Sequence, residues 1–470
     1  VRIEAMTGKK KNIERPPQFV LPNEFPGAIW YGDEEIDAVT RVIRNQSPFR
    51  YYGPECGLEV KGFEREFARF LASQPGRDWP EDSDIHVTAV NSGTGALEVA
   101  LDALGVGCGD EVIVQGFMWI ATISAIIRNR AIPVLVDSDD TMNMDPAVLR
   151  DKVTPRTKVI LPVPMLGGCA RIGAIMAVVR EINAERKAQG LAPVRVLEDC
   201  AQVLGAHARG IRGSVEPMGE EGIQRVGTFG DVGIFSLQIN KNITAGEGGM
   251  IATRDPEIAR RIEAFHNVGY AKDAEPVQNW YGDVPLGWGQ GRRMTELQGA
   301  LARVQLRKLD SILANMRGSH ARLENHVREL GLVPRGRADA DNPGDTGYYC
   351  IFHLPPNGTD DEAKIARGRA VAAALNEWGL HPWFLHDFEV HVYYNILPLI
   401  EKWPLNNGCP WRCPRNAFHT DYRYHRGTLP RLDEEFVTTV GINVPSQLTR
   451  EHEAHIFSVL DYVYETMIRQ

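Results

Sequence analysis

A single lysine, Lys241, stands in the stretch FSLQINKNITAGEGGM, which runs from Phe235 to Met250. The stretch holds no other cation, and its one acid is Glu247. A partly buried lysine loses its proton more readily than a solvated one, and the neutral amine attacks carbonyl compounds. Because most lysines in such places are solvated, Lys241 by itself indicates only a candidate nucleophile.

Two further segments carry groups that could act with this amine. LEDCAQ places Asp199 at the end of a strand-like run, where an unpaired carboxylate is costly to bury. A protonated ring nitrogen would pair with it, and so would an arginine or the start of a helix. NSGTGALE changes from strand to turn to helix, and the free N–H groups of a helix start bind anions. Thr94 adds a hydroxyl donor, although an ordinary capped helix has the same pattern.

Together these groups match the requirements of pyridoxal phosphate. The helix start would bind the phosphate, Asp199 would keep the pyridine nitrogen protonated, and Lys241 would hold the aldehyde as a Schiff base. The protonated ring can then act as an electron sink. The combination, in order along one α/β unit, is more informative than any one of its members.

The elements that must position these groups predict an α/β fold. From Ile85 to Thr253, apolar strand-like runs alternate with helical ones, which indicates a mainly parallel sheet covered by helices on both faces. In such sheets ligands bind beyond the carboxyl ends of the strands, where Asp199 stands. We predict a mainly parallel, mixed sheet of the seven-stranded type and a smaller C-terminal α+β domain.

The predicted organisation has three parts. Residues 1–30 form an N-terminal arm, 31–255 a large cofactor-binding domain, and 256–470 an interdomain helix followed by the small domain. The interdomain helix is expected to break or kink near Gly318, since glycine weakens a helix interior.

Five segments resemble the DegT/DnrJ/EryC1/StrS family of sugar aminotransferases, which have the aspartate aminotransferase fold (fold type I). They are NSGTGAL, GFMWIAT, LEDCAQ, GDVGIFSLQINKNITAGEGG and RRMTELQGAL, and the resemblance weakens over the C-terminal unit. It implies that Lys241 also moves a proton between cofactor and substrate carbons. It further implies that Gln202 bonds the phenolic oxygen of the cofactor and that Trp119 stacks on its ring. The phosphate would be held by Thr94, Gly95 and Ser236.

By this resemblance we expect a pyridoxal-phosphate-dependent aminotransferase, with pyridoxamine phosphate as the intermediate form. An amino group would move from glutamate or glutamine to a keto-sugar or keto-cyclitol, in antibiotic or polysaccharide biosynthesis. One alternative is a sugar dehydratase of the same family, whose members typically carry His at the position of Lys241. The other is a non-catalytic binding protein, which should lose the Asp or the Lys. Both residues are present here.

The family builds each site from two chains, so we expect a homodimer with shared active sites. Many members read Gly-Tyr-Asn-Tyr-Arg-Met before a Thr-Glu pair, and that Asn reaches the partner's cofactor. Here the stretch is GQGRRMTE, with Gly291 in place of the Asn. Arg292 or Arg293 could replace it, or an insertion over 272–290 could shift the alignment.

The segment 402–430 invites a zinc interpretation. Cys409, Cys413, His419 and His425 have the spacing Cys-x3-Cys-x5-His-x5-His, which is looser than usual structural zinc patterns. A folded loop packed by aromatic and proline residues is favoured, and no metal is predicted. The polar aromatic residues around His419–Tyr424, with HPWFLHDFEVHVYYN, are candidates for recognising substrate hydroxyls.

Composition disfavours several classes of function. The chain has 470 residues and a net charge of −9 without a long basic tract, which argues against nucleic acid or an anionic membrane as the main partner. No apolar run is long enough to span a bilayer, and the first residues lack the apolar core of a signal peptide. A cytoplasmic location is predicted. The seven scattered cysteines favour reduced thiols over a disulfide framework.

Overall fold

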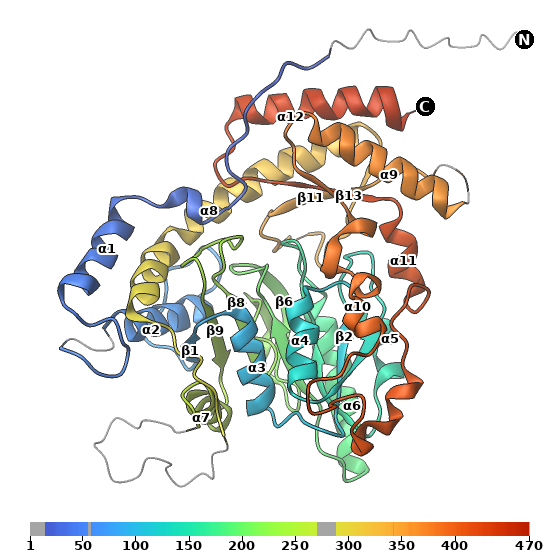
Figure 1. Cartoon of the computed structure of the whole chain (residues 1–470). Coiled ribbons are helices and arrows are strands. Elements are labelled where there is room, and N and C mark those ends of the chain that lie inside the picture. Colours follow the sequence, from blue (N-terminus) through green and yellow to red (C-terminus); the bar gives the residue numbers. More distant parts are fainter. Residues whose placement is uncertain are drawn as a thin grey trace, which may run out of the picture.

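The computed structural model describes residues 15–54, 58–269, 288–341, 343–356, 358 and 360–469. Its centre is a seven-stranded sheet in the order β1-β9-β8-β5-β4-β2-β3 (Figure 1). β9 runs antiparallel to both of its neighbours, and the other strand pairs are parallel. This confirms the predicted fold class. The strands are β1 (His86–Val90), β2 (Glu111–Gln115), β3 (Ile132–Val136), β4 (Thr157–Leu161), β5 (Arg195–Asp199), β8 (Val232–Ser236) and β9 (Gly249–Thr253).

Helices cover this sheet, which explains why its strands are apolar on both faces. Every residue of β2, β3, β8 and β9 is buried, as expected for strands packed from both sides. α3 contacts β8 and β9, and α6 contacts the β6–β7 hairpin. The helices are α2 (Leu58–Ala72), α3 (Gly93–Ala103), α4 (Ile120–Arg128), α5 (Pro146–Leu149), α6 (Ile172–Ala188) and α7 (Pro256–Phe265); the hairpin is β6 (His207–Arg212) and β7 (Met218–Arg225).

A 34-residue helix, α8 (Glu296–Glu329), connects the large sheet to the rest of the chain. The prediction of a break at Gly318 was wrong. A glycine costs a helix about 1 kcal/mol relative to alanine, and tertiary packing offsets that here. α8 contacts α1 (Asp33–Arg44) and α2 toward its start, and β11 and α12 toward its end (Figure 1).

A second, smaller sheet has the order β10-β11-β13-β12, with antiparallel pairing throughout. It packs with α9 and α12 around a separate apolar core that includes Leu323, Phe352 and Leu460. The elements are β10 (Val333–Pro334), β11 (Tyr349–His353), α9 (Asp361–Asn376), β12 (Pro382–Phe384), β13 (Thr439–Asn443) and α12 (Arg450–Val463). The predicted boundaries at 30 and 255 stay predictions.

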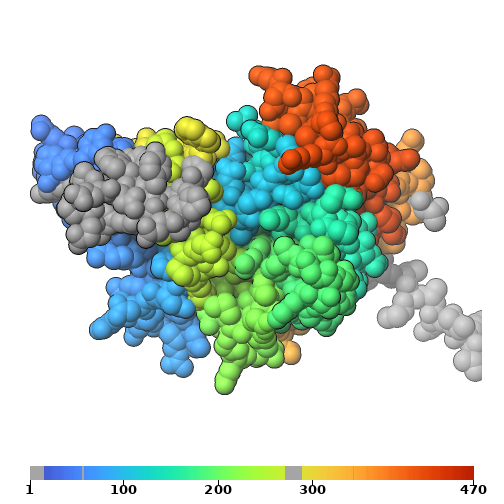
Figure 2. All heavy atoms as spheres, turned by 90° about the horizontal axis from the view of Figure 1, so that it is seen from below, coloured from blue at the N-terminus to red at the C-terminus, as the bar shows by residue number. Residues whose placement is uncertain are grey.

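Residues 385–436, here called the C-terminal segment, pack on the large core although they lie between two strands of the small sheet. Phe388, Tyr393 and Leu432 are buried in that core. In Figure 2 the segment (orange to red) and the N-terminal part of the described chain (dark blue) lie at opposite sides of the face seen. The segment contains 3-10 turns, α10 (Leu397–Ile400) and α11 (Pro430–Phe436).

Among the described helices, none combines the length and apolarity that crossing a bilayer demands.

Candidate active site

A cavity of about 440 Å³ lies at the carboxyl end of the large sheet. Its lining comes from the segments that follow β1, β2, β4, β5 and β8, where open α/β sheets bind ligands. Most of the residues singled out in the sequence line it together, although they come from four separate segments. They are Thr94, Trp119, Asp199, Gln202, Ser236 and Lys241.

The start of α3 forms a polar rim of this cavity. Ser92 caps the helix, and its Oγ accepts a 3.0 Å hydrogen bond from the N–H of Gly95. Gly95 is therefore engaged in the cap and does not line the cavity, whereas Gly93 and Thr94 do. A Cβ at Gly93 would lie 2.8 Å from that of Ser236, so glycine is needed to bring the end of β8 against the helix start. The result places the Ser236 hydroxyl beside the positive end of the α3 dipole.

Asp199 is a buried carboxylate at the end of β5. Its Oδ2 accepts a 2.8 Å hydrogen bond from the hydroxyl of Thr122, and its Oδ1 accepts one of 3.2 Å from the N–H of Ala201. Burial raises the pKa of Asp199, and these two bonds and the charge of Lys241 oppose the rise. An acid in this setting gains from a cationic partner in the cavity. The role of Thr122 was missed in the sequence, although it belongs to the motif GFMWIAT.

Lys241 is half-buried and lines the cavity. Burial lowers its pKa to about 8, against the opposing fields of Asp199 and Glu247. About a tenth of the amine is therefore neutral at pH 7, far more than for an ordinary lysine, and this form can act as a nucleophile. The N-terminal part of the described chain holds the backbone of this turn, since the N–H of Gly27 donates a 3.2 Å hydrogen bond to the carbonyl of Lys241.

The chain matches the model of the DegT/DnrJ/EryC1/StrS aminotransferase family over residues 31–380. It belongs to that family. The protein is therefore an aminotransferase, as the motifs predicted.

Related proteins support the assignment. The aminotransferase is 37% identical over 320 residues, 67% of each chain, to the L-glutamine:2-deoxy-scyllo-inosose aminotransferase of Streptoalloteichus tenebrarius. It is 32% identical over 381 residues to the spore coat polysaccharide biosynthesis protein SpsC of Bacillus subtilis, covering 79% of this chain and 84% of the relative. The crystal structure of 3-amino-5-hydroxybenzoic acid synthase superposes with a TM-score of 0.70 at 27% identity, over 97% of this chain and 100% of that one.

In this aminotransferase the C-terminal segment completes the cavity beside Trp119. The Trp119 and His391 rings lie 4.6 Å apart at 45°, and His391 stacks on Phe388 at 4.0 Å. The N–H of Met118 donates a 2.9 Å hydrogen bond to the carbonyl of His391, which docks the segment onto the loop after β2. Burial and, to a smaller extent, the charge of Lys241 together lower the pKa of His391 to about 4, so the imidazole is neutral near pH 7.

The structure corrects the hypothesis about the loop around His419–Tyr424. Among the described residues, none from 402–430 lines the cavity. Tyr422 instead bonds Glu111 at 2.8 Å, and Tyr424 donates a 2.7 Å bond to the carbonyl of Pro133, because these rings pack on β2 and β3. HPWFLHDFEVHVYYN does reach the cavity, through Trp383, Phe388, Glu389 and His391.

Both arginines near Gly291 are engaged within their own chain. Arg292 pairs with Glu98 of α3, and Arg293 donates a 2.9 Å hydrogen bond to Asn267. The backbone of Arg292 accepts from the N–H of Asn91, which places this stretch beside the start of α3. The insertion suspected over 272–290 lies mostly outside the described residues, which omit 270–287. Which residue would reach a partner subunit stays a prediction.

Proposed function

We propose that this aminotransferase binds pyridoxal phosphate and moves an amino group from L-glutamate or L-glutamine to a ketone on a sugar or cyclitol. The product would be an amino sugar or aminocyclitol of an antibiotic or polysaccharide pathway. One observation carries the proposal: Lys241, Asp199 and the start of α3 converge on one cavity. The donor and acceptor classes follow the relatives, one named for glutamine and an inosose, another for a spore coat polysaccharide.

The residues present fit this cofactor. The N–H groups of Gly93 and Thr94, with the hydroxyl of Ser236, would hold its phosphate. Asp199 would pair with the pyridine nitrogen, and Trp119 would lie against the ring. The Oε1 of Gln202 accepts a 2.8 Å bond from the N–H of Leu166, which leaves its amide N–H₂ to donate to the phenolic oxygen.

Side chains of the protein would then move the proton and exclude water. The bound cofactor supplies an electron sink for cleavage of a C–H bond. Lys241 Nζ would take the proton from the α-carbon of the donor and deliver a proton to the carbon that was the ketone of the acceptor. Its lowered pKa suits both directions of transfer. Trp119 and the stacked pair Phe388–His391 would exclude water from the face where the proton moves.

We also propose a homodimer with shared sites. Four apolar side chains on α1, the loop after it and the start of α2 are exposed: Ile36 63%, Ile43 63%, Tyr52 72% and Leu58 56%. α1 and α2 both pack on α8, and these two helices lie at one side of the molecule (Figure 1). Exposed apolar patches of this kind mark interaction surfaces. Light scattering should give twice the chain mass, reduced toward one chain by Ile36→Glu with Ile43→Glu.

The test of function has two stages. Borohydride reduction of the cofactor-loaded protein, followed by digestion and mass spectrometry, should place the cofactor on Lys241, and Lys241→Ala should carry none. Label in the α-amino nitrogen of glutamine or glutamate should then appear on a ketocyclitol or ketosugar, whereas label in the amide nitrogen of glutamine should not. Attachment at another residue would overturn the site. Attachment at Lys241 without nitrogen transfer to any ketone would overturn the activity.

A further inference from the structure

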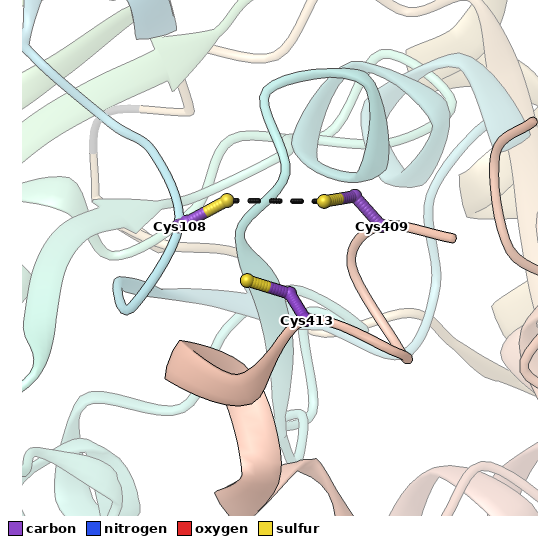
Figure 3. Close-up of side chains that lie close together, drawn as sticks. All are labelled: Cys108, Cys409 and Cys413. Atoms are coloured by element: carbon purple, nitrogen blue, oxygen red, sulfur yellow. Dashed lines mark hydrogen bonds between the residues drawn. The ribbon is translucent and has the colours of Figure 1, made fainter. Parts of the chain in front are cut away.

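Three cysteines from distant parts of the chain meet outside the active-site cavity. Cys108 lies in the turn between α3 and β2, and Cys409 and Cys413 belong to the C-terminal segment. Their Sγ atoms all lie within 4.8 Å of one another, with 3.9 Å between Cys108 and Cys409 (Figure 3). None of the three lines the active-site cavity.

The 3.9 Å between the Cys108 and Cys409 sulfur atoms is close to the spacing of two thiolates on one metal ion. Two thiolates at the usual Zn–S distance of about 2.3 Å from a tetrahedral ion lie about 3.8 Å apart. A disulfide would bring two of the sulfur atoms to about 2.0 Å from each other and would leave the third thiol unpaired. We propose that Cys108, Cys409 and Cys413 bind one zinc ion.

The two segments are held together independently of any metal, so the site is preformed. Asn416 is fully buried and connects them. Its Oδ1 accepts a 2.7 Å hydrogen bond from the N–H of Gly109, the neighbour of Cys108. Its Nδ2 donates to the carbonyl of Pro410, the neighbour of Cys409, at 3.1 Å. Ligands fixed by such contacts bind a metal without paying for the ordering of two loops.

The fourth ligand is a water molecule. Among the described residues, no further His, Cys, Asp or Glu joins this group, and neither His419 nor His425 belongs to it. The three cysteines are half-buried, so one side of the ion faces solvent. The sequence pattern that was considered for zinc and set aside lay within one loop, so it could not include Cys108, which lies 301 positions from Cys409.

The ion would fasten the C-terminal segment to the large sheet. That segment carries Phe388 and His391 to the cavity, so the metal acts as a structural clamp at a distance from the chemistry. Each coordinating thiol gives up its proton, and binding therefore weakens as the pH falls.

The first test is metal content under reducing conditions. Wild-type protein from zinc-supplemented cells should contain about one zinc ion per chain. Cys108→Ser and Cys413→Ser should lose it, while Cys350→Ser, which alters a buried cysteine of the small core, should keep it. Lys241→Ala should also keep it, so failure here is distinguishable from failure of the proposed function.

The second test needs only the wild-type chain and so survives variants that do not fold. Cobalt added to the reduced, zinc-free protein should give sulfur-to-cobalt charge-transfer bands and the strong visible bands of tetrahedral geometry. Reduced protein that takes up neither ion would overturn the proposal. So would a Cys108–Cys409 disulfide found by mass spectrometry in metal-free protein as isolated, since it would assign these thiols to a redox pair.

Discussion

The hydroxyl of Thr122 lies 2.8 Å from Oδ2 of Asp199, and both side chains are buried. Trp119 is the N-cap residue of α4, and Thr122 lies in the first turn of the same helix. One helix start therefore orients both the indole beside the cavity and the acid at the end of β5.

Thr122→Val should weaken cofactor binding while leaving the fold in place. Hydrogen bonds to charged groups contribute about 1.5–3 kcal/mol, which corresponds to a rise in Kd of about 10- to 100-fold. Titration of cofactor-free protein, followed by absorbance, measures it. Thr439→Val, at another fully buried threonine that bonds a carbonyl, is the matched control. Equal affinity in wild type and Thr122→Val would show that this bond does not govern Asp199.

The rate at which pyridoxal phosphate attaches to cofactor-free protein should follow the deprotonation of the Lys241 amine. Its pKa is lowered to about 8 from an ordinary 10.5, so the rate should rise with pH and level off above about 8. Glu247 stabilises the ammonium, and Glu247→Gln should move the midpoint to lower pH. Stopped-flow absorbance with borohydride trapping gives the profile, and Glu257→Gln on the exposed face of α7 is the control. A midpoint near 10.5, or one that rises in Glu247→Gln, would contradict this account.

His391→Phe should separate the stacking role of the ring from its polar role. Phenylalanine keeps the contacts with Trp119 and Phe388 but removes the ring nitrogens. His391 lines the cavity, where one of its ring nitrogens would bond a hydroxyl of the acceptor. We expect cofactor affinity to stay within a factor of about two and kcat/KM for the acceptor to fall about 10-fold, the value of one neutral hydrogen bond.

The lowered pKa of His391 also predicts how the reaction depends on pH. Because burial lowers the pKa of His391 to about 4, the imidazole stays neutral as the pH crosses its ordinary value of 6.5. The pH profile of kcat/KM for the acceptor should therefore show no inflection near pH 6.5 that comes from His391. Wild type and His391→Phe should have profiles of the same shape in this range. Such an inflection would mean that the ring titrates during the reaction.

Gly116→Ala should push the C-terminal segment away from the sheet. A Cβ at Gly116 would lie 2.2 Å from Leu429 and 2.9 Å from Tyr393, and the carbonyl of Gly116 accepts from the N–H of Tyr393. Overpacking of this kind costs about 1–3 kcal/mol, read as a fall in the free energy of unfolding in denaturant. Gly222→Ala in β7, where a Cβ meets nothing within 4 Å, should change stability little. Equal stability of the two variants would refute tight docking at Gly116.

Local sequence patterns predicted the sheet and most of the cavity because each depends on short segments. Runs such as Ile132–Val136 are apolar throughout, and Thr94, Asp199 and Lys241 each lie at or shortly after the end of a strand. The segment HPWFLHDFEVHVYYN was named as a candidate, but the individual contribution of His391 could not be predicted, since it depends on a contact with the loop after β2, which is far away in the chain. The same holds for Cys108. At Gly318 the local signal was misleading because packing along both sides of α8 outweighs the preference of one residue.

The contact between Gly27 and the carbonyl of Lys241 has a practical consequence. Removing the chain through Gly27 would remove the hydrogen bond from its N–H to the carbonyl of Lys241. The turn that carries the reactive amine would lose this support, although the cleavage lies more than two hundred positions upstream. Protein cleaved at this point should therefore release the proposed cofactor sooner during storage than uncleaved protein does.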